Sequence, residues 1–260
     1  MKISCGRDRP LVMGILNLTP DSFSDGGRWT DSEAAVRHAI EMVEQGADII
    51  DVGAESTRPG SEPVPATVEW ERLQVVLKEL TATLEVPLSV DTVKAEVAGR
   101  ALDLGVDIVN DVNGLRGDGM MRVCADHGAT VVIGHMTGEY GNMHTIHMGQ
   151  NYREEIRSFL DAQCTLASDA GISDDRIIVD PGLGFGKTAE QNMKIIQDCS
   201  FLGRSHPILV GASRKRFVRQ IFPDMDVDDA TAMLSKKAVD SGASIVRVHD
   251  VARTVSVLRP

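Results

Sequence analysis

Eight short apolar segments recur along the chain, and polar or charged side chains stand at the end of nearly every one. The segments are residues 12–17, 48–53, 87–92, 107–111, 130–135, 176–182, 207–214 and 244–250. They are rich in isoleucine and valine and scarcely alternate between apolar and polar residues, which is typical of parallel strands covered on both faces. The pattern therefore predicts eight buried parallel strands.

Helical periodicity fills the intervals between these strands. Apolar residues fall on one face over 68–84 and again over 152–170. Gly171 stands where the second of these helices should end, and Asp228 is a candidate N-cap for a later helix. Strand and helix are therefore expected to alternate eight times.

This alternation fits two architectures, a closed (β/α)8 TIM barrel and an open doubly wound sheet. The 260 residues allow about 33 residues for each strand and helix, and a single barrel typically has about 250 residues. An open sheet would gather catalytic groups mainly at one switch point. Because polar residues end essentially all the strands here, we favour one barrel domain over residues 1–260, with the first ten residues covering its bottom.

Composition limits the classes of partner that this protein could bind. The formal net charge of −11 argues against nucleic acid or an anionic membrane as the main partner. No apolar run approaches the roughly 20 residues of a membrane helix, and the N-terminus lacks a secretory signal core. The four cysteines are widely spaced, which favours a reducing compartment. We therefore expect a cytoplasmic protein that acts on small molecules.

Acidic and amide side chains end three of the central strands. Asp91 and Asp180 follow the third and sixth strands, and Asn110 lies in the fourth. Such groups could form a catalytic dyad, bind a metal, accept hydrogen bonds from the N–H groups of a heterocycle, or take part in structural salt bridges. A glycosidase-like pair of carboxylates is disfavoured, since aromatic residues for sugar stacking make up only 4% of the chain.

Basic side chains gather at the last two strands. Residues 213–217 read SRKRF and begin a predicted helix, while Arg247 and His249 alternate along the eighth strand. Helix N-termini and basic residues attract anions, and strands seven and eight of a barrel commonly frame a phosphate site. This end of the chain therefore predicts an anionic ligand.

Three loops remain. The segment 180–188, DPGLGFGKT, fails both the Walker A and the dinucleotide patterns, so it is either a plain glycine turn or a loop that lets a flat ligand approach the backbone. Residues 17–27 are typical of a surface loop that could close over a ligand. Residues 55–60 contain Arg58, which could be a ligand contact or a solvated charge.

Taken in order, NLTPDSFSDGG, ESTRPG, SVDT, NDVNG, DPGLGFGK, SRK and RVHDV resemble the dihydropteroate synthase family. The resemblance runs from residue 12 to about residue 252. It implies a (β/α)8 barrel that joins 6-hydroxymethyl-7,8-dihydropterin diphosphate to 4-aminobenzoate with Mg²⁺ and releases diphosphate. It also implies a sulfonamide target, although the residues themselves do not give the sensitivity to these inhibitors.

The resemblance also implies roles for individual residues. Those that would hold the pterin are Asp91, Asn110, Asp180 and Lys215. Asn17 would contact Mg²⁺ and diphosphate, with help from Arg247 and His249. The arylamine would lie among Thr57, Arg58, Pro59, Phe185 and Ser213. Asp21 and Phe23 would belong to the closing loop, and Gly184 and Met136 are further expected substrate contacts. The expected catalytic residues are Asp21, Lys215, Arg247 and His249.

Some features depart from the family pattern. Residues 133–152 lack its usual proline motif, and we interpret them as a variable loop because His135, His144 and His147 have no standard zinc spacing. A homodimer is the expected assembly, although residues 228–234 differ from the family and the last helix is short.

Two alternative functions remain open: a pterin-dependent methyltransferase acting with a corrinoid protein, and a non-catalytic pterin-binding relative.

Overall fold

The computed structural model describes residues 9–18, 28–56, 63–138, 146–203 and 205–259. All eight expected strands are present within them. They are β1 (Leu11–Asn17), β2 (Ile49–Gly53), β3 (Leu88–Asp91), β4 (Ile108–Asp111), β5 (Thr130–Gly134), β6 (Ile177–Asp180), β7 (Leu209–Val210) and β8 (Ile245–Val248).

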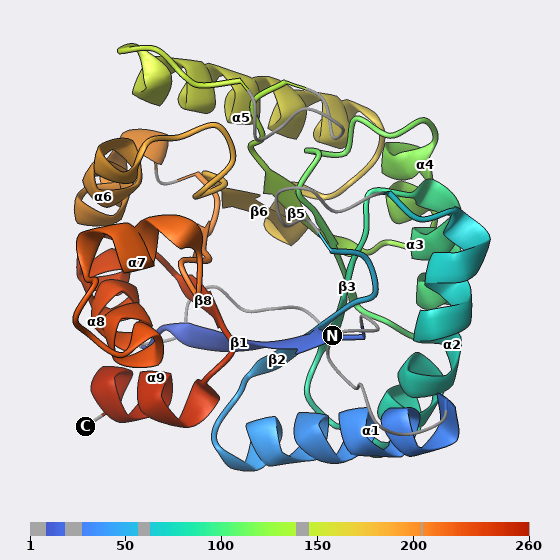
Figure 1. Cartoon of the computed structure of the whole chain (residues 1–260). Helices are drawn as coiled ribbons and strands as arrows, with labels where there is room; N and C mark the ends of the chain where they lie inside the picture. The colour runs from blue at the N-terminus through green and yellow to red at the C-terminus, as the bar shows by residue number, and fades with distance from the viewer. Residues whose placement is uncertain (1–8, 19–27, 57–62, 139–145, 204, 260) are drawn as a thin grey trace.

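The strands form one parallel sheet that curls almost completely into a barrel (Figure 1). Its order is β6-β5-β4-β3-β2-β1-β8-β7, so the two edge strands are β6 and β7. A single bridge between Val179 and Ile208 joins these edges, supported by a hydrogen bond of 3.0 Å from Val179 N to Pro207 O. The predicted (β/α)8 barrel is therefore confirmed.

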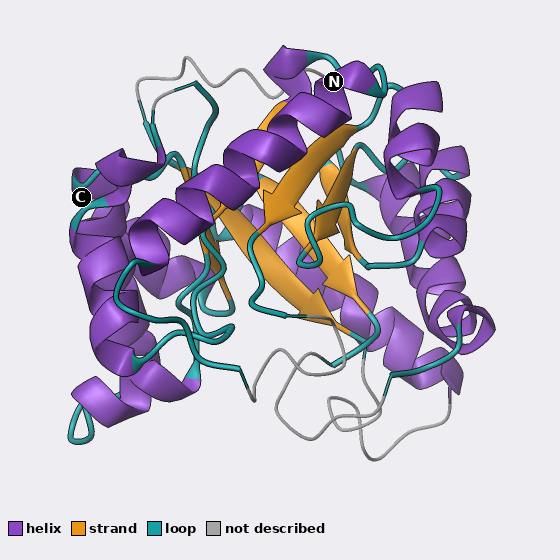
Figure 2. Cartoon of the chain, turned by 90° about the horizontal axis from the view of Figure 1, so that it is seen from above, coloured by secondary structure: helices purple, strands orange, loops and turns teal. Residues whose placement is uncertain are grey.

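Helices surround the strands on all sides in the views of Figures 1 and 2. They are α1 (Arg28–Glu44), α2 (Ala66–Thr83), α3 (Ala95–Asp103), α4 (Met120–Asp126), α5 (Tyr152–Asp169), α6 (Ala189–Gln197), α7 (Arg216–Ile221), α8 (Val227–Asp240) and α9 (Val251–Leu258). Two short 3₁₀ helices, η2 (Asp174–Arg176) and η3 (Cys199–Leu202), precede β6 and β7.

Strict alternation fails between β7 and β8, where two helices occur instead of one. Pro223 stops α7 because the residue before a proline is disfavoured in the α conformation, and Phe222 accordingly has φ −124° and ψ 65°. The N-cap of α8 is Asp226, which accepts hydrogen bonds from the backbone N–H groups of Asp228 and Asp229. The expectation that Asp228 itself caps this helix was wrong by two residues. Gly171 follows the end of α5 with φ +101°, as predicted.

Side chains alternate between two apolar cores along each strand. The inside of the barrel is filled by one cluster, whose members are Leu11, Met13, Ile49, Ile108, Val132, Ile178, Leu209 and Ile245. The opposite faces of the strands pack against the helices in a larger cluster. Each fully buried aliphatic side chain contributes about 1.5–3 kcal/mol. The smaller apolar cluster fills the inside of the barrel, and the polar residues of the predicted site lie at the carboxyl ends of the strands.

The amino end of the barrel has a cluster of its own. Asp48, just before β2, accepts a hydrogen bond of 2.7 Å from Arg9 and another from Arg259 near the end of the chain. The rest of the expected N-terminal covering segment, residues 1–8, lies outside the described residues.

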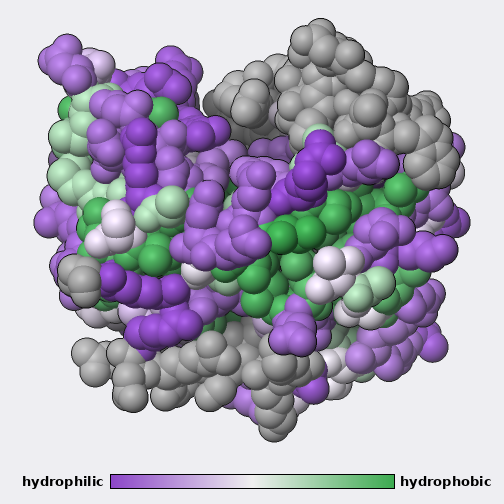
Figure 3. Space-filling model, turned by 90° about the horizontal axis from the view of Figure 1, so that it is seen from below, coloured by the Kyte–Doolittle hydropathy of each residue, from purple (hydrophilic) through white to green (hydrophobic). Residues whose placement is uncertain are grey.

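The face in Figure 3 is seen from below relative to the view of Figure 1. In the middle of this face, apolar side chains reach the surface among polar ones. None of the described helices is long and apolar enough to span a bilayer.

Candidate active site

A pocket of about 1030 Å³ opens beside the carboxyl ends of the strands. The strand register sets Asp91 of β3 beside Gly53 of β2 and Asn110 of β4, so polar ends from distant parts of the chain meet at one rim. Eight residues proposed from the sequence line this pocket: Asn17, Asp91, Gly184, Phe185, Ser213, Lys215, Arg247 and His249. The expected convergence of strand ends on one cavity is thus observed for these residues.

Arg247 of β8 links two carboxylates across the barrel. Its guanidinium donates to Asp51 Oδ2 at 2.6 Å and to Asp91 Oδ2 at 2.7 Å. Asp51 is fully buried, and its Oδ2 also accepts from Asn110 Nδ2 at 3.1 Å. Since a guanidinium carries five N–H donors, these contacts leave others for a ligand in the pocket.

Burial shifts the protonation of the groups around Arg247. It raises the pKa of Asp91 to about 7, although the nearby Arg247 acts in the opposite direction. Burial also raises the pKa of Asp180, against the effect of Lys215, and lowers the pKa of Lys215 to about 8. With pKa values of about 7 and about 8, Asp91 and Lys215 can exchange between donor and acceptor roles near neutral pH.

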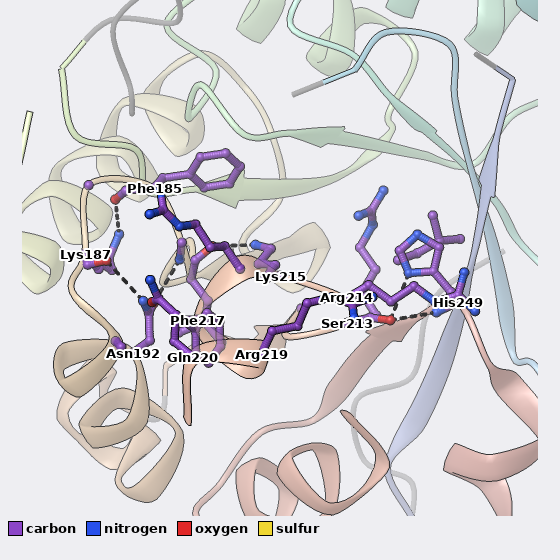
Figure 4. Close-up of a pocket in the computed structure, with 18 of the residues that line it drawn as sticks. Phe185, Lys187, Asn192, Ser213, Arg214, Lys215, Phe217, Arg219, Gln220 and His249 are labelled. Carbon is purple, nitrogen blue, oxygen red and sulfur yellow. Dashed lines mark hydrogen bonds between the residues drawn. The ribbon is translucent and has the colours of Figure 1, made fainter. Parts of the chain in front are cut away.

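His249 connects β1 to the end of β7. Its Nδ1 lies 2.8 Å from Ser213 Oγ, and its Nε2 lies 3.4 Å from Asn17 Nδ2. The amide nitrogen can only donate, so Nε2 accepts and Nδ1 carries the proton that Ser213 Oγ accepts. The backbone N–H of His249 donates to the same Oγ at 3.1 Å. These contacts fix the imidazole ring on one side of the pocket (Figure 4).

The glycine loop, residues 181–187 between β6 and α6, forms the opposite side (Figure 4). Lys215 Nζ donates to Leu183 O and lies 4.7 Å from the centroid of the Phe185 ring. A Cβ at Gly184 would come within 3.2 Å of Lys215 Cδ, and its φ of +85° also favours glycine. The loop therefore brings its backbone close to Lys215.

Several predicted residues have other positions. Met136 follows β5 and packs against Phe185. Asp180 Oδ1 accepts a hydrogen bond of 2.7 Å from Gly182 N. All five residues of the 213–217 segment line the pocket, and Arg214 also pairs with Asp228 at 2.9 Å. The remaining candidates lie outside the described residues; they are Asp21, Phe23, Thr57, Arg58 and Pro59.

Two residues that the sequence reasoning did not select belong to this arrangement. Asp51 is the common partner of Arg247 and Asn110, and Lys187 is buried beneath the glycine loop. The signal for Asp51 was its place near the end of the second predicted strand, because Asp91 and Asp180 were selected for the same kind of position at the ends of other strands. Lys187 is the last residue of the DPGLGFGK motif. The motif was tested only as a nucleotide-binding pattern, so a structural role for this lysine was not predicted. The His135 of the variable loop is the partner of this lysine.

Comparison with known proteins agrees with this geometry. Residues 13–249 match the family described as pterin binding enzyme, and the chain belongs to that family. A dihydropteroate synthase from Synechocystis sp. is 42% identical over 248 residues, covering 94% of this chain and 86% of that protein. The resemblance inferred from the motifs is thereby confirmed.

Solved structures give the same result. The dihydropteroate synthase of Xanthomonas albilineans with 4-aminobenzoic acid has a TM-score of 0.90 and 40% identity, covering 96% of this chain and 91% of that one. The Yersinia pestis enzyme in complex with a sulfonamide drug has a TM-score of 0.89 and 37% identity, covering 96% and 92% of the two chains.

Proposed function

We propose that this protein is a transferase that joins 6-hydroxymethyl-7,8-dihydropterin diphosphate to 4-aminobenzoate and releases diphosphate. One observation carries the proposal: Arg247 is held by Asp51 and Asp91 in the pocket that also contains His249 and Lys215. Groups suited to a heterocycle and groups suited to an anion therefore meet at one point. The family membership and the relatives named above support the same activity.

The pterin-binding groups in this proposal are Asp91, Asn110, Asp180 and Lys215. The carboxylates and the amide oxygen accept hydrogen bonds from ring and exocyclic N–H groups, while Lys215 donates to the ring carbonyl. The raised pKa of Asp180 and of Asp91 shows that burial disfavours their charges, so a bound ligand that donates hydrogen bonds stabilises their ionised forms.

Arg247 and His249 take the diphosphate. Asn17 fits a role with Mg²⁺, because its Nδ2 is directed to His249 and its oxygen is the atom type that Mg²⁺ prefers. No cluster of three or more His, Cys, Asp or Glu side chains suited to a metal occurs among the described residues. A single protein oxygen is nevertheless compatible with Mg²⁺, which is often bound largely by substrate phosphates and water. Bound Mg²⁺ would stabilise negative charge on the departing diphosphate.

The chemical step is a substitution at the pterin methylene carbon. The carbon–oxygen bond to diphosphate breaks and its electron pair leaves with the diphosphate. The amine nitrogen of 4-aminobenzoate then forms the new bond to carbon and loses a proton. An aryl amine is already uncharged near neutral pH, so no activating base is needed before the attack. Arg247 stabilises the leaving anion, and His249 adds to this once its Nε2 carries a proton and donates to the anion instead of accepting from Asn17; both effects accelerate the reaction.

The arylamine is proposed to lie beside Phe185 and Ser213. Thr57, Arg58 and Pro59 would complete its site from the loop after β2. Asp21 and Phe23, from the loop after β1, would approach the reacting carbon, where the Asp21 carboxylate stabilises positive charge. Met136 packs against Phe185 and Gly184 lies against Lys215, so both shape this side of the pocket.

We further propose a cytoplasmic homodimer. Three cysteines, Cys124, Cys164 and Cys199, are free thiols, which suits a reducing compartment. Met225, Met233 and Val257 lie between α7 and the end of α9 with 43%, 40% and 37% of their surfaces exposed. These apolar side chains support a contact between copies through the late helices, and analytical ultracentrifugation tests it.

A diphosphate-release assay separates this function from its alternatives. Purified protein is mixed with dihydropterin diphosphate, Mg²⁺ and 4-aminobenzoate, and both diphosphate and the coupled product are measured. We expect both to form together, and neither to form without the arylamine. A corrinoid-dependent methyltransferase would bind the pterin without needing its diphosphate. Tight binding of the pterin diphosphate with no turnover would identify a non-catalytic relative and overturn the proposal.

A further inference from the structure

Lys187 is a buried amine with no place in the reaction described above. Only 7% of its surface is exposed. Its Nζ donates to Gly182 O at 2.8 Å and to Phe185 O at 3.1 Å, and it lies 3.0 Å from His135 Nδ1. Burial lowers the pKa of Lys187 to about 7. In its charged form the amine has three N–H donors and no acceptor, so these three acceptors match it fully.

The acceptor role of His135 follows from its surroundings. Burial lowers the pKa of this imidazole to about 2, and the nearby Lys187 adds to the effect, so the ring is neutral. Its ring meets that of Phe159 edge-on at 5.1 Å, and its backbone N–H donates to Asp180 O at 2.9 Å. His135 is therefore held at the end of β5, with Nδ1 facing Lys187.

The glycine loop wraps closely around Lys187. At Gly182, where φ is +65°, a Cβ would lie 1.8 Å from His135 O, so no side chain fits between the loop and β5. Asn192 of α6 holds the other side of the loop. Its Oδ1 accepts from Gly184 N at 2.8 Å, and its Nδ2 donates to Lys187 O at 3.2 Å (Figure 4).

The same loop provides the contacts of Lys215. Leu183 O accepts from Lys215 Nζ, and the Phe185 ring lies 4.7 Å from that nitrogen. Lys187 binds the carbonyl of Phe185 directly. A continuous set of contacts thus runs from His135 through Lys187 and Phe185 to Lys215. Lys187 also borders the pocket, but its Nζ is turned to Gly182 O, Phe185 O and His135 Nδ1.

We propose that Lys187 is a positioning residue: together with His135 it fixes Phe185, and through Phe185 it sets the arylamine side of the pocket. The effect of Lys187 on arylamine binding rests on the proposed function, whereas the positioning of Phe185 does not. If Lys187 instead contributes only to global stability, its loss lowers the melting temperature without changing the surroundings of Phe185 or the preference between substrates.

The test replaces the six phenylalanines with 4-fluorophenylalanine and follows the fluorine NMR signal of Phe185, which is assigned by the Phe185→Leu variant. We expect Lys187→Met to shift or split this signal while the signal of Phe222 stays in place. The KM for 4-aminobenzoate rises about tenfold, and the KM for the pterin changes by less than about twofold. Lys194→Met removes an exposed lysine of α6 and serves as the matched control, with wild-type values expected.

A folded Lys187→Met protein with an unchanged Phe185 signal and an unchanged arylamine KM overturns the proposal. If Lys187→Met does not fold, His135 supplies a second comparison. His135→Asn keeps an acceptor close to the position of Nδ1, whereas His135→Leu removes it. We expect the leucine variant to shift the Phe185 signal and the asparagine variant to retain it. Identical spectra for the two variants contradict the proposal, and because the spectra need no turnover, they stand even if the enzyme activity is not found.

Discussion

Arg247 and Asp51 are 196 positions apart in the chain and meet inside the barrel at 2.6 Å. Asp51 also accepts from Asn110, so one buried carboxylate holds a cation proposed to bind diphosphate and an amide proposed to bind the pterin. Removing a member of a buried charged pair is costly because its partner is left without compensation. Asp51 is therefore as important to the site as the residues that face the ligand.

The first prediction concerns Asp51→Asn, which keeps the shape of the side chain and removes its charge. We expect kcat/KM to fall at least about tenfold and the free energy of unfolding to drop by about 2 kcal/mol, since hydrogen bonds to charged groups are lost. Steady-state kinetics and urea denaturation measure the two effects. Asp161→Asn, at an exposed position on α5, is the control and should behave as wild type.

Asp180→Ala is expected to weaken pterin binding at least about tenfold, which corresponds to the loss of one charged hydrogen bond. Isothermal titration calorimetry with the pterin measures this directly. Binding of 4-aminobenzoate analogues should change much less. Equal pterin affinity in the variant and the wild type would remove Asp180 from the proposed site.

The activity should fall as the pH rises through the pKa of Lys215. Burial lowers this pKa to about 8, so below pH 8 the side chain is an ammonium that can donate, and above it the charge is lost. We expect an alkaline limb near pH 8 in the kcat/KM profile. Lys215→Arg keeps a permanent charge and should lose this limb, even though its maximal rate is lower. A limb that stays in place in Lys215→Arg assigns it to another group.

Magnesium dependence tests the role of Asn17. Chelation by EDTA should abolish turnover, and added Mg²⁺ should restore it. Asn17→Ala is expected to raise the Mg²⁺ concentration required for half-maximal activity by about tenfold or more, because a protein oxygen ligand is lost. The thermal stability measured without Mg²⁺ and substrates reveals any loss from the contact with His249. An unaltered Mg²⁺ requirement would show that Asn17 does not bind the ion.

Sulfonamides are expected to compete with 4-aminobenzoate. The relative from Yersinia pestis was solved in complex with a sulfonamide drug, and its fold is very close to this one. Inhibition should raise the apparent KM for 4-aminobenzoate and leave the maximal rate unchanged. Purely uncompetitive inhibition with respect to the arylamine would contradict a shared site.

The fold could be predicted largely from the sequence because barrel strands produce a strong local signal. Continuous runs such as 130–135 are buried on both faces, and their spacing leaves room for one helix each. The extra helix between β7 and β8 was missed, although Pro223 marks the point at which α7 ends. β7 itself is only two residues long, far shorter than its apolar run, because strand length depends on the pairing partner.

The site was predicted less completely. Strand ends such as Asp91 and Arg247 are visible in a sequence because they follow apolar runs. The partnership of Asp51 with Arg247 depends on how the strands are staggered around the barrel, which no local pattern records. Lys187 and His135 likewise meet only after β5 and β6 pair, and their contact joins a motif residue to a segment that departs from the family pattern.

The gap in the barrel wall between β6 and β7 has a dynamic consequence. A single bridge at Val179 and Ile208 closes it, so few amide protons there are shielded by cross-strand bonding. The strands on either side carry Asp180 and lead to Ser213 and Lys215. Deuterium uptake should therefore be faster at this seam than along the extensively paired β1 and β2, and bound pterin should slow it. The least hydrogen-bonded part of the barrel wall would then be the part that substrate binding stabilises.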